Sequence, residues 1–202
     1  MNKQTPYNPL DKANLGESVA DALLRKPQIR LSDVKRFAGA GIYAVYFGGD
    51  FPPYAPISSK GNGEIPIYVG KAVPPGARKG GFGLDADPGA ALYKRLKEHS
   101  ESIEQAANIN PDDFSCRYLS VDDIWIPLGE ALLIAKFCPL WNKIIDGFGN
   151  HDPGKGRYKQ ARSRWDTLHP GRSWAIKCQT RSENADQIIT EVEEFLKGFE
   201  PN

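Results

Sequence analysis

The sequence lacks a long apolar run. Its longest unbroken aliphatic stretch extends from Ala131 to Ala135, whereas a membrane-spanning helix needs about 20 apolar residues. The segment from Met1 to Leu10 is polar and contains two prolines, so we expect no signal peptide. The sequence therefore predicts a protein that has no membrane partner.

Cysteine is also scarce. The three cysteines, Cys116, Cys138 and Cys178, are odd in number and far apart. This pattern argues against a disulfide framework, a CxxC redox pair and a cysteine-rich zinc site. Unpaired cysteines are typical of a reducing compartment, so we expect a cytoplasmic protein.

An excess of either charge is absent as well, since 26 basic residues balance 25 acidic ones. The distribution along the chain is nevertheless uneven. Residues 151–181 hold eight lysines and arginines against two acids, and residues 182–202 hold six acids against one lysine. A basic segment of this kind can contact a polyanion, but on charge alone a solvated surface is the better interpretation.

Runs of β-branched and aromatic residues predict three strands, over residues 41–47, 65–69 and 114–121. Apolar periodicity and helix-start residues predict helices over 17–25, 32–37, 88–107 and 127–138, and an amphipathic helix from Ile188 to near Gly198. This order predicts an α/β fold, in which a small three-stranded sheet, mixed or antiparallel, is flanked by helices.

The length of 202 residues fits one compact domain, because domains commonly contain about 100–200 residues. Within it we expect an N-terminal helical arm over 1–38 and a core over 39–145. Clusters of glycine and proline predict loop insertions into this core at 48–64 and 74–87. Residues 146–202 would form an extension that carries the basic segment and the last helix.

Arg95 and His99 are four residues apart, so they share one face of the predicted helix. His99 also falls within the apolar stripe of Leu92, Leu96 and Ile103, which directs it toward the sheet. Taken alone, the two residues are best explained as a core histidine and an arginine whose stem packs on apolar surface.

Glu130 is harder to explain by packing. It lies on the same helix face as Leu133, Ile134 and Phe137, where a carboxylate is costly without a partner. A helix N-terminus favours acids, but this accounts better for an exposed glutamate. An arginine or a metal ion would satisfy Glu130, and hard cations prefer carboxylate oxygen.

Tyr43 and Tyr68 lie on two strands that we expect to pair at a spacing of about 4.8 Å. The two phenols can then meet on one face, although ordinary cross-strand packing often produces such pairs. Lys71 follows Gly70, at the expected end of the second strand, and is either a ligand contact or a surface lysine.

Together these residues place two phenols, a guanidinium, an imidazole and a semi-buried carboxylate around one small sheet. Such a set suits phosphodiester hydrolysis. The carboxylate can hold a divalent metal, and the guanidinium can offset developing negative charge. A phenol or an imidazole can accept the proton of the attacking water.

The two strand motifs, Gly41-Ile42-Tyr43 and Tyr68-Val69-Gly70, resemble the signature of the GIY-YIG nuclease superfamily. The further motif residues Arg95, His99, Glu130 and Asn142 follow in the order found in that superfamily. The resemblance spans residues 41–142, about half of the chain. Segments 146–151 and 169–172 resemble the type II restriction endonucleases of this superfamily that cut the palindrome CCGCGG.

The resemblance implies a role for each motif residue. Tyr43 would be the general base or would orient the water, and nearby positive charge would favour its deprotonated form. Tyr68 and His99 would position the water and relay its proton. Arg95 would bind the scissile phosphate, and Asn142 would hold the site together by hydrogen bonds.

Glu130 would hold a single Mg2+, for which Mn2+ would substitute. Because only one acid stands at a ligand position, a two-metal mechanism is not expected. The resemblance also implies cleavage that leaves short 3′ overhangs.

The expected partner is double-stranded DNA. Arginine reads guanine in the major groove, and lysine more often contacts phosphate. The predicted DNA contacts are therefore Lys71, Arg157, Arg162, Arg164 and Arg172. A palindromic target implies a homodimer, and a restriction enzyme works beside a DNA methyltransferase that protects the host.

Two other functions remain open from the sequence. One is a repair or homing-type endonuclease of the same superfamily, and the other is a DNA-binding module without catalysis. The presence of all six motif residues argues against the second.

Overall fold

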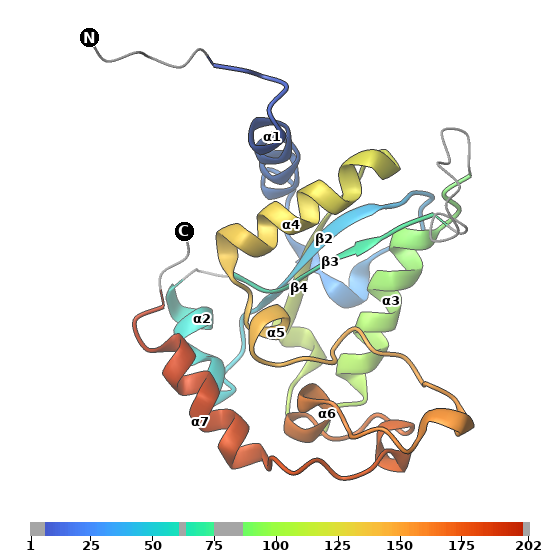
Figure 1. Ribbon diagram of the computed structural model, residues 1–202, viewed down its shortest axis with the longest axis vertical. Coiled ribbons are helices and arrows are strands. Elements are labelled where there is room, and N and C mark those ends of the chain that lie inside the picture. Colours follow the sequence, from blue (N-terminus) through green and yellow to red (C-terminus); the bar gives the residue numbers. More distant parts are fainter. Residues whose placement is uncertain (1–6, 61–63, 75–86, 200–202) are drawn as a thin grey trace.

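The computed structural model describes residues 7–60, 64–74 and 87–199. Its centre is an antiparallel sheet of four strands in the order β1-β4-β2-β3 (Figure 1). The strands are β1 (Ile29–Arg30), β2 (Gly41–Phe47), β3 (Pro66–Ala72) and β4 (Phe114–Ser120). The predicted α/β class is confirmed, but the prediction of three strands is wrong, because a two-residue strand such as β1 is too short to show a pattern in the sequence.

Strand β2 lies in the middle of the sheet, and all seven of its residues are buried. Successive side chains of a strand point to opposite faces. Tyr43 and Val45 therefore enter one core cluster, whereas Ile42 and Ala44 enter a second one. Burial on both faces explains why this strand reads as a continuous run of apolar and aromatic residues.

Two helices, α1 (Lys12–Leu24) and α4 (Ile126–Phe137), cover the face of Ile42 and Ala44. They lie side by side above the sheet in Figure 1. The side chain of Asp11 accepts a hydrogen bond from the backbone of Ala13 and caps α1, so this helix starts five residues before its predicted start. No helix in the described parts of the chain combines the length and the apolar character that crossing a membrane requires.

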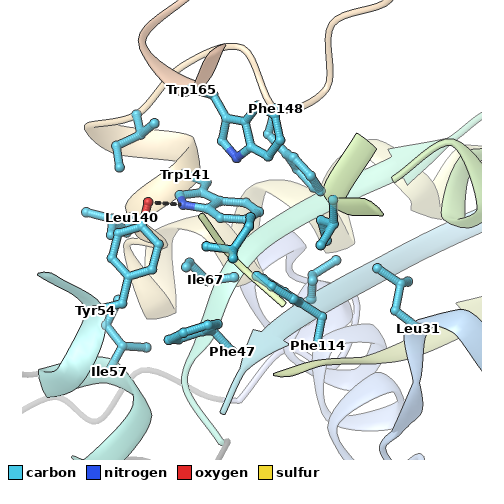
Figure 2. Packing of buried hydrophobic residues seen from close by; sticks show 14 of the residues in the cluster. Leu31, Phe47, Tyr54, Ile57, Ile67, Phe114, Leu140, Trp141, Phe148 and Trp165 are labelled. Carbon is cyan, nitrogen blue, oxygen red and sulfur yellow. Dashed lines mark hydrogen bonds between the residues drawn. The ribbon is translucent and has the colours of Figure 1, made fainter. Parts of the chain in front are cut away.

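The other face is covered mainly by α3 (Ala91–Glu104), α5 (Leu140–Lys143), α6 (Arg164–Leu168) and α7 (Ala185–Leu196). Large aromatic side chains fill the space beneath them (Figure 2). Trp141 of α5 packs against Phe148 and against Trp165 of α6, with ring centroids 4.5 and 5.7 Å apart. The C-terminal extension thus shares one core cluster with the central strand.

Several predicted boundaries differ from the observed ones. The helix expected over 32–37 is wrong: a 3-10 turn, Leu31–Asp33, is followed by extended chain. Strand β3 continues to Ala72, so Lys71 lies inside the strand and not after its end. The insertion expected over 48–64 contains the helix α2 (Ala55–Lys60), and most of the second one, residues 75–86, lies outside the described residues.

A buried chain of hydrogen bonds joins the aromatic core to the loop after α3. Trp141 donates to the Tyr54 hydroxyl at 3.0 Å, and this hydroxyl lies 2.6 Å from Nε2 of His169. Nδ1 of His169 is 2.9 Å from the side-chain oxygen of Asn108. An amide oxygen only accepts, so Nδ1 carries the proton and Nε2 accepts from Tyr54. Burial lowers the pKa of His169 to about 3.

This burial predicts a pH-dependent stability. In the unfolded chain His169 takes up a proton below its usual pKa of 6.5, whereas the folded protein resists protonation down to about 3. The free energy of unfolding should therefore fall as the pH drops between these values, by about 1.4 kcal/mol per pH unit for such a histidine. Urea unfolding at pH 7 and pH 4 measures this fall. His169→Gln should reduce it, and an equal fall in both proteins would contradict the assignment.

Candidate active site

The pairing of β2 with β3 brings two phenols together. Tyr43 lies opposite Gly70, and Tyr68 lies opposite Val45, so the two tyrosines are diagonal neighbours on one face of the sheet. Their ring centroids are 6.2 Å apart. A Cβ atom at position 70 would lie 2.4 Å from the Tyr43 hydroxyl. Glycine is therefore required here because the phenol folds directly over the backbone.

Helix α3 supplies an imidazole to the same face. His99 is 1% exposed, and its Nε2 lies 2.6 Å from the Tyr43 hydroxyl. The ring of Phe148 stacks on the other side of His99, with centroids 4.4 Å apart and an interplanar angle of 15°. The imidazole is thus fixed between the phenol of a central strand and an aromatic ring of the loop after α5.

Burial determines the resting protonation of this pair. It raises the pKa of Tyr43 well above its usual value, with a further increase from Tyr68, although the charge of Arg95 acts in the opposite direction. Burial, followed by the charge of Arg95, holds the pKa of His99 well below its usual value. The charge of Arg95 favours the deprotonated form of Tyr43, as expected, but burial outweighs this effect in the resting site. Both groups are therefore neutral in the resting site, and they share one buried hydrogen bond between the Tyr43 hydroxyl and Nε2 of His99.

Arg95 lies one turn before His99 on α3, at the edge of this pocket. Its guanidinium donates to Glu98 at 3.3 Å and to the carbonyl oxygen of Gly149 at 2.9 Å. Burial lowers the pKa of Arg95, whereas its interactions with Tyr43, Tyr68 and Glu98 together raise it, and the net shift is upward. Arg95 therefore remains charged, and its side chain is partly open to solvent.

Glu130 approaches the pocket around the edge strand β3. It lies on α4, half-buried, and one of its carboxylate oxygens is 2.6 Å from the ammonium of Lys71. Burial raises the pKa of Tyr68, and the charge of Glu130 adds to this shift. The acid is thus close enough to act on the phenol electrostatically, although α4 packs on the opposite face of the sheet.

Asn142 completes the edge of β3. Helix α4 ends at Phe137, and Pro139 leads the chain into α5, which carries Asn142. Its side-chain oxygen accepts from the backbone N–H of Val69, and its amide nitrogen donates to the carbonyl of Val69, both at 2.8 Å. Asn142 thereby pairs with the edge strand as a neighbouring strand would.

The donor set at this edge fits Mg2+. The described residues contain no group of three or more histidine, cysteine or acidic side chains that could enclose a metal ion. Mg2+ does not need such a cage, because it usually retains several waters and binds one or two carboxylates together with substrate phosphates. Glu130, whose side chain is 20% exposed and paired with Lys71, is the side chain that would hold the ion.

Arg172, one of the predicted DNA contacts, is instead an interior residue. Its side chain is 1% exposed and forms a bidentate pair with Asp166, with N···O distances of 2.6 and 2.7 Å. It also donates to the carbonyl oxygens of Gly147, Phe148 and Asn150. All five N–H donors of a guanidinium are then used, so the prediction that Arg172 reads DNA is corrected.

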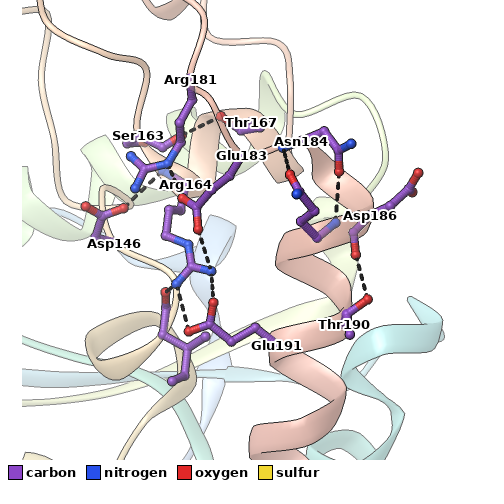
Figure 3. Close-up of polar contacts among 12 residues, drawn as sticks. Asp146, Ser163, Arg164, Thr167, Arg181, Glu183, Asn184, Asp186, Thr190 and Glu191 are labelled. Atoms are coloured by element: carbon purple, nitrogen blue, oxygen red, sulfur yellow. Dashed lines mark hydrogen bonds and ion pairs between the residues drawn. The ribbon is translucent and has the colours of Figure 1, made fainter.

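Arg164 also has a structural environment. It donates to the carbonyl of Ile144 and forms ion pairs with Glu183 and with Glu191 of α7 (Figure 3). The acidic C-terminal segment therefore neutralises part of the basic one within the same chain. Arg162 is partly buried and donates to the carbonyl of Ala175, whereas Arg157 is exposed.

A sequence profile of the Eco29kI GIY-YIG domain matches residues 35–196. The chain belongs to the Eco29kI GIY-YIG domain family. No curated protein sequence matches the chain. The GIY-YIG domain identifies the chain as a nuclease, and a nuclease of this kind binds DNA. All six motif residues from Tyr43 to Asn142 lie within the matched region.

The sequence argument did not identify two residues that the structure places at the site. Phe148 stacks on His99, and His151 lies 2.5 Å from Arg95. Both belong to segment 146–151, which resembles restriction enzymes but in which no single residue was expected to have a role. A phenylalanine and a histidine beyond the last motif residue give no periodic signal by which their position could be inferred.

The Arg172–Asp166 pair predicts a large loss of stability for one substitution. Asp166→Ala would leave a buried guanidinium without its counter-ion, which typically costs about 3–5 kcal/mol. Urea unfolding at pH 7 measures the difference from the wild type. Asp152→Ala, at an exposed position of the same extension, is the matched control and should change stability by less than about 1 kcal/mol. A loss below 1 kcal/mol in Asp166→Ala would contradict the interior role.

Proposed function

We propose that the protein is a type II restriction endonuclease. It hydrolyses phosphodiester bonds of double-stranded DNA in a Mg2+-dependent reaction at a GC-rich palindrome, CCGCGG. The observation that carries this proposal is the hydrogen bond between Tyr43 and His99, next to Arg95 and within electrostatic reach of Glu130. The resemblance of segments 146–151 and 169–172 to enzymes that cut this palindrome supports the choice of target.

The buried pair provides a route for the proton of the attacking water. As water attacks the phosphorus, its proton passes to the Tyr43 oxygen, and the Tyr43 proton moves to Nε2 of His99. The phosphodiester bond to the 3′ oxygen breaks, and the departing oxygen acquires a proton from solvent. Tyr43 is thus protonated before and after the attack. His99 holds the extra proton only during the attack and then releases it to solvent, because burial and the charge of Arg95 keep its pKa low.

Arg95 and Tyr68 orient the reactants. The guanidinium remains charged and can offset the negative charge that develops on the phosphate. Tyr68 borders the same space and can hold the water in line. A Mg2+ ion held by Glu130 would stabilise the leaving 3′ oxygen, and Mn2+ would substitute for it.

We assign recognition of the DNA sequence to the extension, residues 146–202. Arg157 is exposed, and Lys155 and Lys159 beside it add positive charge. Such residues supply phosphate contacts or base contacts in GC-rich DNA. A palindromic target calls for a homodimer with one active site for each strand. A DNA methyltransferase would protect the host DNA, and the enzyme would act in the cytoplasm.

Incubation of plasmid DNA with the protein and Mg2+ tests the activity. We expect discrete fragments whose sequenced ends map to one palindrome and carry short 3′ overhangs. Fragments with scattered ends would favour a repair or homing-type nuclease. DNA binding without cleavage in either Mg2+ or Mn2+ would favour the non-catalytic module and overturn the proposal.

Two substitutions test the assigned roles. Tyr43→Phe and Glu130→Gln should each fold, bind DNA and cut at least about a hundredfold more slowly, as expected when a proton-transfer group or a metal ligand is removed. Single-turnover cleavage measures the loss. Tyr7→Phe, at an exposed position, and Glu193→Gln are the controls and should cut like the wild type. Wild-type rates in either site variant would contradict that assignment.

Arg157 is the test of the recognition surface. If it contacts phosphate, Arg157→Ala should weaken binding and reduce the slope of log affinity against log salt by about one. Fluorescence anisotropy at several salt concentrations measures both. Arg25→Ala, an exposed position at the end of α1, is the matched control. An unchanged slope in Arg157→Ala would remove Arg157 from the DNA contacts.

A further inference from the structure

We propose that His151 positions the guanidinium of Arg95, so that the segment from Gly147 to His151 forms a clamp on the phosphate-binding arginine. This inference rests on the proposed function, because it concerns the same site. It assigns a role to a residue outside the six motif positions. His151 is a positioning residue here, acting on the substrate only through Arg95.

The clamp holds Arg95 beside the phenol of Tyr68, since a Cβ atom at Gly149 would lie 3.0 Å from the Tyr68 hydroxyl. Nη1 of Arg95 lies 2.5 Å from Nε2 of His151, and Nη2 donates to the carbonyl of Gly149 at 2.9 Å. Nη1 also donates to Glu98 on α3. Three of the five donors of the guanidinium are thereby used, and its remaining polar interactions are with the phenols, chiefly that of Tyr43.

Nε2 of His151 faces the guanidinium of Arg95 and also lies 3.6 Å from a carboxylate oxygen of Glu98. A guanidinium has donors but no acceptor, so in a hydrogen bond with Arg95 it is Nε2 that accepts. The side chain is 59% exposed, so His151 is not a core histidine held by packing. Its acceptor atom is instead directed at an arginine of the active site.

The segment that carries His151 is itself held in place. Arg172 donates to the backbone carbonyls of Gly147, Phe148 and Asn150 from within the core. At Gly149 the backbone approaches the site so closely that a Cβ atom would lie 2.8 Å from Nη2 of Arg95. The buried Arg172 thus holds the clamp through its backbone carbonyls, and the clamp in turn holds the guanidinium of Arg95.

Such a clamp matters because the guanidinium is a planar fork. Without His151, Arg95 would retain its contacts with Glu98 and Gly149, but the end at Nη1 could turn toward Glu98 or solvent. A misplacement of a catalytic group by about 1 Å can reduce the rate about a hundredfold. The loss should appear in the cleavage step more than in DNA affinity, because in this proposal His151 acts through Arg95 and not on the substrate.

Three variants test this role. His151→Ala removes the acceptor, His151→Gln places an amide oxygen where Nε2 stands, and Asp152→Ala changes an exposed side chain just outside the clamp. We expect His151→Ala to slow single-turnover cleavage at least about tenfold with DNA affinity within about threefold of the wild type. His151→Gln should recover most of the rate, and Asp152→Ala should match the wild type. Wild-type cleavage by His151→Ala, or no recovery in His151→Gln, would overturn the proposal.

A second measurement does not depend on cleavage. In 15N-arginine-labelled protein, restricted rotation of a clamped guanidinium gives separate Nη signals, and Arg95→Lys identifies those of Arg95. His151→Ala should shift the Nη1 signal and bring the Nη signals closer together, because Glu98 and Gly149 alone then hold the guanidinium, and His151→Gln should leave them nearer to their wild-type positions. If the wild-type protein fails to cut DNA, the proposed function fails, but these signals still decide the clamp. Unchanged signals in His151→Ala would refute it.

Discussion

The hydrogen bond between Tyr43 and His99 is the contact on which the rest of the site depends. Both side chains are buried, where an unpaired hydroxyl or imidazole would carry a large desolvation penalty. The hydroxyl and the imidazole therefore have to be paired with one another. This pairing constrains the position of α3 relative to the central strand β2. The same burial keeps both groups neutral, so that the phenol can pass on a proton as it receives one.

Two arginines of the extension that were expected to contact DNA instead form ion pairs that stabilise the fold. Arg172 is bound to Asp166 and to three backbone carbonyls, and the ring of Trp165 lies 4.5 Å from its guanidinium. Arg164 pairs with acids before and within α7. The opposite charges of the two C-terminal segments thus partly neutralise one another within the chain, which leaves fewer basic side chains for DNA than their number suggests.

The edge strand β3 brings together residues that pack on opposite faces of the sheet. Tyr68 points to the face of α3, whereas Lys71 reaches Glu130 of α4 on the other face. Asn142 binds the backbone of Val69 between them. An edge strand has a free row of backbone groups. At this edge the Tyr43–His99 pair lies on one face of the sheet, and the carboxylate of Glu130 reaches the edge from the other face.

The sequence by itself determined the central strands, the main helices and the six motif residues, because alternation, periodicity and motif spacing are local properties of the chain. It also placed Arg95 and His99 on one helix face, since four residues make about one turn. Only the tertiary structure decided that the Tyr43 pKa is raised, that Arg172 is buried, that Lys71 pairs with Glu130 and that His151 reaches Arg95. These facts depend on desolvation and on contacts between residues far apart in the chain, and neither is encoded in the spacing of neighbouring residues.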